Sequence, residues 1–215
     1  SRMDVGSLMM PLGTTIGTTN AVMFGVALMN YRDAELNVHP NRPPPRMTHH
    51  DEDAPAWWNV HKKSRLYVES FSPKGHRPMM QFLLVGENGP EKFRDWEDDF
   101  RDITAYIESL RAPKYPWPID AELAARGAAV FNRSCASCHG TYGEKAKYPE
   151  RIVPIDVVKT DPVRLGSLTP ANRREYGKSW FTHFGREKVI EDPGGYVAPP
   201  LDGVWATAPY FHNGS

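Results

Sequence analysis

The stretch Cys135-Ala136-Ser137-Cys138-His139 decides what the second half of this 215-residue chain folds around. Two thiols three residues apart lie on one side of a helical turn, so both can reach the two vinyl groups at one porphyrin edge. The residue after the second cysteine then brings its imidazole beneath the iron. Cys-x-x-Cys-His is the spacing that attaches haem c, and we therefore predict one covalent haem c on Cys135 and Cys138, with His139 as the proximal iron ligand.

Two other chemistries also use paired cysteines. A thioredoxin-like redox pair is expected near a βαβ pattern, with a helix after the cysteines, whereas here a predicted helix precedes them and a loop beginning at Gly140 follows. A structural zinc site needs four ligands, usually with a second Cys/His pair, and the chain has only two cysteines. Haem c is therefore the interpretation that the spacing favours.

The composition limits the class of protein. The length allows one large domain or two small ones. Lys plus Arg and Asp plus Glu both number 26, so no charge excess points to nucleic acid. Twenty prolines and 17 glycines indicate long loops. The longest apolar run, Ala21 to Met29, is about half of the roughly 20 residues that a membrane span requires, and we expect a buried segment and no membrane span.

Three helices are predicted. The first runs from about Glu91 to Arg111, where apolar residues recur at steps of three and four. Residues 112–118 contain three prolines and must be extended, because each proline moves the preceding residue out of the helical region. Asp120 is the predicted N-cap of a second helix that leads into the cysteine motif. A third helix begins at Thr169-Pro170 and ends near Phe184.

The rest of the chain has weaker patterns. Two short apolar segments, Leu66–Val68 and Phe82–Val85, are predicted to be short strands or buried extended segments. After residue 140 the chain is predicted to be mostly loop. The expected fold class is therefore mostly α with extensive loops.

From about Pro113 onward, the order of helix, haem motif, Gly140 and irregular loop resembles a class I cytochrome c domain. In such domains a proline carbonyl downstream of the motif often accepts the proximal histidine's N–H and fixes its ring. The resemblance makes Pro154 the candidate, with an ordinary loop proline as the alternative. It implies a haem-binding cytochrome domain over residues 113–215, preceded over residues 1–112 by a partial or degenerate cytochrome-like region that ends in the amphipathic helix.

A second resemblance lies in the C-terminal stretch from residue 195, which reads GYVAPPLDGVWATAPYFHNGS. It is similar to the segment that follows the last haem motif in rubber-oxygenase-like and bacterial di-haem peroxidase-like cytochromes. In those families the Ala-Pro-Tyr-Phe-His-Asn-Gly portion lies beside the haem. The resemblance implies that Trp205, Tyr210 and His212 are haem-pocket residues, with a surface turn as the alternative.

The same families imply a longer chain. Their members continue past this point and usually carry another haem motif in an earlier cytochrome domain, whereas here no cysteine precedes Cys135. We expect a chain that begins partway through one cytochrome domain and ends partway through a second, as part of a longer di-haem protein. A mono-haem protein with a haem-free N-terminal half is the alternative.

The sixth iron ligand separates an electron carrier from a catalyst. Methionine or histidine at that position suits electron transfer, while an open position permits peroxide or dioxygen to bind. All eight methionines precede the haem motif. The candidates within the chain are Met79, Met80, His183 and His212.

These features predict a c-type cytochrome that works in the periplasm or otherwise outside the cytoplasm, because haem c is attached there. The leading function is electron transfer to a redox partner protein, as part of a di-haem oxidoreductase. The alternative is a haem enzyme, a peroxidase or oxygenase, whose iron activates peroxide or dioxygen. A third hypothesis is a docking module that only relays charge.

Overall fold

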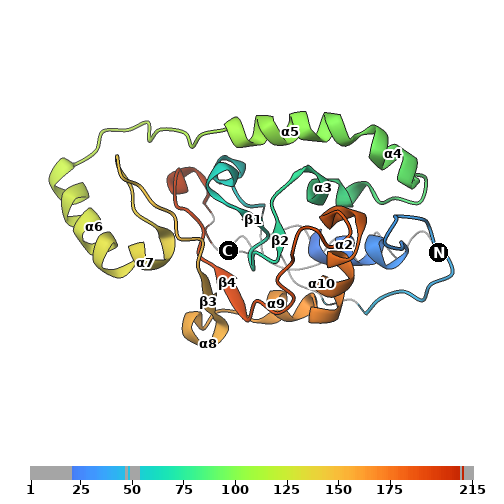
Figure 1. The fold of residues 1–215 in the computed structure, drawn as a ribbon. Helices are drawn as coiled ribbons and strands as arrows, with labels where there is room; N and C mark the ends of the chain where they lie inside the picture. Colours follow the sequence, from blue (N-terminus) through green and yellow to red (C-terminus); the bar gives the residue numbers. More distant parts are fainter. Residues whose placement is uncertain (1–20, 47, 49–53, 209, 211–215) are drawn as a thin grey trace.

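The computed structural model describes residues 21–46, 48, 54–208 and 210, and most of its regular structure is helical (Figure 1). Short helices and two small sheets are joined by long irregular segments, as the proline and glycine content predicts. The elements in chain order are α2 (Ala21–Asn30), η1 (Trp57–Lys62), β1 (Arg65–Leu66), β2 (Ser72–Pro73), α3 (His76–Met79), η2 (Met80–Leu83), α4 (Pro90–Asp95), α5 (Glu97–Ser109), α6 (Ala121–Ser134), α7 (Ala136–His139), β3 (Ile152–Pro154), α8 (Ile155–Val158), α9 (Val163–Ser167), α10 (Pro170–Gly177), η3 (Trp180–Thr182), β4 (Gly195–Val197) and η4 (Val204–Ala206), where η marks a 3-10 helix.

The hydrophobic core draws on both halves of the chain. Phe71 and Phe93 from the first half meet Tyr176, Trp180 and Phe181 from the second. The Phe93 ring lies edge-on to Trp180 at 5.9 Å between centroids, and Tyr176 stacks on Phe181 at 5.6 Å. Such aromatic pairs add to the free energy gained from burial. The predicted division near residue 113 stays a prediction, and this core contains residues from both sides of it.

A buried ion cluster lies beside this core. The Glu69 carboxylate accepts from Arg164 at 3.0 Å and from Arg173 at 3.4 Å. All three side chains are almost completely buried. Burial lowers the pKa of Arg173, and the neighbouring Glu69 opposes that shift. The cluster connects the turn between β1 and β2 to α9 and α10.

The apolar run at residue 21 forms α2. Its Val26, Leu28 and Met29 pack against the core but are only half-buried, so the expected buried segment is covered in part. Within the part of the chain that the structure describes, no helix combines the length and apolar character needed to cross a membrane.

The predicted helix from Glu91 to Arg111 is divided into α4 and α5 by Trp96 and ends at Ser109. Phe93 and Ile107 are buried, but Ile103 near the middle of the stripe is exposed. The two helices lie along one edge of the molecule (Figure 1), so only part of the apolar stripe is covered.

Two other predictions need correction. Phe82–Val85, predicted as a short strand or a buried extended segment, is neither, because its first residues belong to the 3-10 turn η2 and both Phe82 and Val85 are exposed. The third helix has the predicted N-cap, where Thr169 accepts from the Asn172 N–H and Asn172 bonds back to Thr169. However, α10 ends at Gly177, before the separate turn η3. Leu66 does lie in a short strand, β1, which pairs with β2.

The haem motif lies on an arm at one end of the molecule (Figure 1). The extended segment 112–118 leads from α5 to α6, as the prolines predict. The Asp120 side chain caps α6 by accepting from the Leu123 N–H at 2.9 Å. After the motif the chain returns through β3, which pairs antiparallel with β4. A Cβ on Gly195 would lie 2.0 Å from the Val153 carbonyl oxygen, so only glycine permits this pairing.

Candidate haem-attachment site

The two cysteines lie on a tight turn between α6 and α7. The Cys135 N–H donates to the Phe131 carbonyl at 2.8 Å, and the Cys135 carbonyl accepts from Cys138 at 3.1 Å and from His139 at 3.0 Å. Both thiols are free and partly exposed. The described sheets are two antiparallel pairs and include no βαβ unit at the motif. This donor set, two accessible thiols followed by an imidazole on one turn, fits covalent haem c.

One ring nitrogen of His139 is already engaged. Its Nδ1 lies 2.8 Å from the Pro199 carbonyl oxygen. A carbonyl only accepts, so Nδ1 carries a proton, and in the neutral ring the lone pair then lies on Nε2, where a metal can bind. The proline that accepts from His139 is therefore Pro199 rather than Pro154. Pro154 lies in β3, where it pairs with Gly195.

The chain reverses immediately after His139. Gly140 has φ +89°, and a Cβ there would lie 2.5 Å from the Lys147 carbonyl oxygen. The same carbonyl accepts from the Thr141 N–H at 2.8 Å and closes the loop. Only glycine combines this φ with so close an approach of backbone.

Two tyrosines of this loop reach the segment that contains Pro199. The Tyr148 hydroxyl donates to the Ala198 carbonyl at 2.8 Å, and the Tyr142 hydroxyl accepts from the Leu201 N–H at 2.7 Å. Burial raises the pKa of both hydroxyls, which therefore stay protonated. A cavity of about 200 Å³ opens beside these residues and is lined in part by His139.

An aromatic cluster borders the arm. The Trp205 indole donates to the Pro113 carbonyl at 3.1 Å. Its ring lies 5.8 Å from Tyr115 and 5.8 Å from Trp117, which are 5.3 Å apart. Trp205 thus packs against a segment that the sequence analysis treated only as a linker. Its role as a haem-pocket residue stays a prediction. The sequence feature that could have predicted this contact is the alternation of aromatic residues and prolines at 115–118.

The apolar side of α6 is uncovered. None of its residues is buried, and Leu123 and Val130 are 58 % and 50 % exposed. Apolar surface gathered in one place usually marks a binding site. This helix and the aromatic cluster offer the kind of surface that packs on a flat apolar macrocycle. Tyr210 is exposed, and His212 lies outside the described residues.

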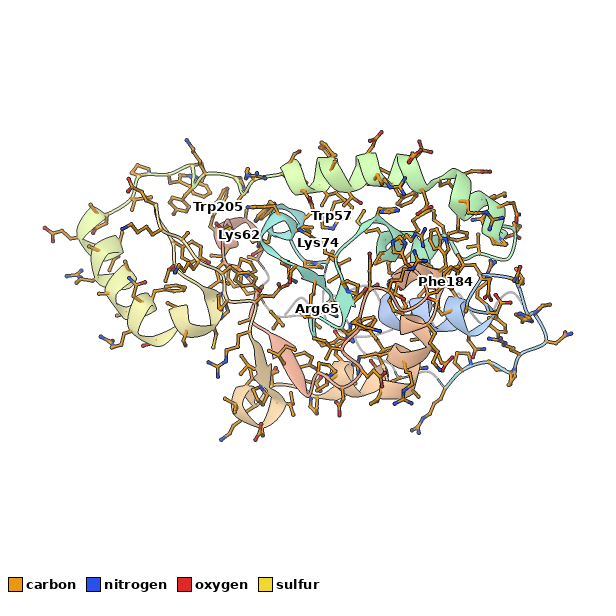
Figure 2. All side chains as sticks on the ribbon, in the orientation of Figure 1. Trp57, Lys62, Arg65, Lys74, Phe184 and Trp205 are labelled. Carbon is orange, nitrogen blue, oxygen red and sulfur yellow. The ribbon has the colours of Figure 1, made fainter. Side chains whose placement is uncertain are left out.

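The other predicted iron ligands are not brought to His139. Met80 is completely buried in the core, and Met79 lies at the end of α3, where its Sδ accepts from the Thr104 hydroxyl at 3.7 Å. Figure 1 shows α3 well separated from α7. His183 pairs with Glu187 at 3.4 Å, and its neighbour Phe184 lies far from the arm in Figure 2.

Comparison with known proteins agrees with part of this site. Residues 195–215 match a family described as RoxA-like, cytochrome c-like. Two curated proteins of Sinorhizobium fredii (strain NBRC 101917 / NGR234) are similar to the chain. Uncharacterized protein y4iM is 29 % identical over 138 residues, with 53 % of this chain and 31 % of the relative covered. Uncharacterized protein y4iJ is 28 % identical over 167 residues, with coverage of 49 % and 27 %.

The chain therefore spans less than a third of the length of these two relatives. The family match is short, but it includes Pro199 and Trp205. The stretch that matches the cytochrome c-like family is thus the one that supplies the hydrogen-bond acceptor for His139. The similarity to a cytochrome c-like family is thus limited to residues 195–215.

Proposed function

We propose that this chain binds one haem c covalently through Cys135 and Cys138, with His139 as the axial iron ligand, and that it transfers electrons. The observation that carries the proposal is the hydrogen bond from His139 Nδ1 to the Pro199 carbonyl. It selects the neutral tautomer that a metal-bound histidine needs, and it orients the ring. The Cys-x-x-Cys-His spacing and the cytochrome c-like match support the same function.

Haem c, when bound, supplies a one-electron couple. The thiols of Cys135 and Cys138 attach it, and the tight turn after Gly140 keeps the His139 ring beside its motif. The Pro199 carbonyl makes the imidazole a stronger donor, which favours ferric over ferrous iron. The uncovered face of α6 and the Trp205 cluster would hold the apolar part of the haem and exclude water from it.

The wider role is part of the proposal. Covalent haem attachment supports a location in the periplasm or otherwise outside the cytoplasm. The coverage of under a third of each relative supports a place in a longer protein, which we propose to be a di-haem oxidoreductase. A separate redox protein then receives or supplies the electron.

Maturation in a bacterial periplasm equipped for haem c attachment tests the proposal. Intact mass is expected to show one added haem, and the two thiols should resist alkylation. Cys135→Ala and Cys138→Ala should each leave a single thioether bond and shift the α band of the pyridine haemochrome. Ser137→Ala, within the same turn, is the control and should leave the band unchanged. A colourless protein with two alkylatable thiols would refute haem attachment.

A second candidate function is activation of peroxide or dioxygen at the same iron. The observation that favours it is the position of Met79, Met80 and His183, which the structure holds away from His139. Carbon monoxide distinguishes the two functions. A reduced spectrum that changes with carbon monoxide supports catalysis at this iron, and an unchanged low-spin spectrum supports simple electron transfer.

A further inference from the structure

Residues Ala198–Asp202, here called the ligand strap, contain the carbonyl that orients His139. The strap follows β4 and is irregular, so no strand partner determines its position. On one side it is held by Tyr142 and Tyr148 of the loop after the haem motif. Its position on the other side depends on a distant part of the chain.

The second side of the strap contacts η1, about 140 residues earlier in the sequence. The Trp58 indole N–H donates to the Asp202 carbonyl at 2.7 Å, and Asn59 Nδ2 donates to the Pro200 carbonyl at 3.1 Å. Lys62 Nζ pairs with the Asp202 carboxylate at 2.6 Å. Three side chains of η1 thus hold two residues of the strap, Pro200 and Asp202.

Close packing reinforces these hydrogen bonds. Gly203, the residue after the strap, has φ +66°, and a Cβ there would lie 3.1 Å from the Trp58 indole nitrogen. The indole therefore packs directly on backbone. Trp58 is partly buried by this contact, whereas its neighbour Trp57 is 56 % exposed. In Figure 2, Lys62 of η1 lies beside Trp205, the residue that follows the strap and Gly203–Val204, whereas Trp57 is labelled farther away.

We propose that η1 is a positioning element for the iron ligand: Trp58, Asn59 and Lys62 hold the ligand strap so that its Pro199 carbonyl accepts from His139. This inference rests on the proposed haem function. The described hydrogen bonds of these three side chains go to the strap and not to His139, so each acts through the strap. The N-terminal half of the chain thereby sets the donor strength of a histidine in the C-terminal half.

The hydrogen bond at His139 Nδ1 determines the direction in which the midpoint potential of the iron changes. A strong acceptor at Nδ1 increases the basicity of the imidazole and stabilises ferric iron. When the strap loosens, that hydrogen bond lengthens or breaks, and the imidazole becomes a weaker donor. Ferrous iron then becomes relatively more stable, so the midpoint potential rises.

Trp58→Phe and Trp57→Phe form a matched pair for the test. Both keep an aromatic ring, but only the first removes a donor to the strap. The haem-loaded chain is measured in each case by redox titration and by the solvent exchange of the His139 Nδ1 proton in NMR spectra. For Trp58→Phe we expect one haem per chain, a more positive midpoint potential and faster proton exchange. Trp57→Phe is expected to match the parent.

Asn59→Leu is the second variant and decides the question if Trp58→Phe does not fold. It removes the neutral donor to Pro200 without changing charge, so a more positive potential and faster exchange again support positioning. Parent-like potential and exchange in the folded variant overturn the role of η1 and leave haem binding intact. Failure of the parent chain to attach haem refutes the proposed function instead, so the two failures are distinguishable.

Discussion

At the scale of single residues, Gly140 combines two constraints on the backbone, a positive φ and a close approach to another segment. Alanine there combines an unfavourable φ of +89° with a Cβ placed 2.5 Å from the Lys147 carbonyl oxygen. We expect Gly140→Ala to lower the free energy of unfolding by about 1 to 3 kcal/mol, measured by chemical denaturation. Gly143→Ala is the matched control, because its φ is +97° but nothing lies within 4 Å of the added Cβ. Equal losses would show that the close approach at Gly140 is unimportant.

The orientation of the His139 ring depends on one proline carbonyl. The sequence offered Pro154 as the candidate acceptor, with an ordinary loop proline as the alternative, and in the structure the acceptor is Pro199. Both prolines follow the haem motif, and proline has the same carbonyl at either position. The choice between them depends on where β3 and β4 carry the two segments, which residue type alone does not encode.

At the scale of elements, α6 depends on its first residue. The Asp120 carboxylate satisfies the Leu123 N–H, one of the four amide groups that lack a partner within a helix. We expect Asp120→Ala to lower the free energy of unfolding of the arm by about 1 kcal/mol, detected by hydrogen exchange of the α6 amides. Asp120→Asn keeps a capping oxygen and should exchange at nearly the parent rate. Equal protection in both variants would contradict the role of the cap.

The acid sensitivity of α5 depends on Glu97. Burial by itself raises the pKa of this carboxyl, but hydrogen bonds from Arg77 and His76 and the charge of Arg101 lower it from 4.5 to about 2. Because the folded-state pKa lies below the ordinary value, the carboxylate stabilises the fold above pH 4.5, and that contribution is lost as the pH falls towards 2.

Glu97→Gln removes this titration. We expect the variant to be less stable than the parent at neutral pH, by on the order of 1 to 2 kcal/mol, and to lose less stability between pH 4.5 and 2. Urea unfolding at a series of pH values measures both effects. Parallel pH profiles for parent and variant would contradict the prediction. Asp98→Gln is the control, because Asp98 is the next residue of α5 and its side chain is exposed.

At the scale of the whole molecule, Glu69 connects parts of the chain that are about 100 residues apart. It neutralises two buried guanidinium groups, those of Arg164 and Arg173. Glu69→Gln keeps the shape but removes the buried carboxylate that pairs with both guanidinium groups. We expect a loss of about 3 to 5 kcal/mol in the free energy of unfolding. Glu191→Gln, which breaks the exposed pair with Arg174, should cost less than about 1 kcal/mol.

The hydrophobic core also connects the two halves of the chain. Because Phe93 packs against Trp180 and Phe181, the described regions before and after residue 113 support each other. Sequence patterns predicted the separate elements but not this packing, since amphipathic stripes do not specify their partners. Even the stripe from residue 91 was only partly covered, because its helix lies at an edge of the molecule.

The sequence by itself determined the features that depend on neighbours along the chain. The haem motif, the caps at Asp120 and Thr169 and the extended proline segment all follow from residues a few positions apart, where sterics and local hydrogen bonds suffice. Only the tertiary structure decided which carbonyl accepts from His139 Nδ1 and which side chains hold that carbonyl in place. Pro199 is 60 positions from His139, and Trp58 is 144 positions from the carbonyl to which it donates. Contacts over such separations depend on how the whole chain packs, because no local preference brings the two ends together.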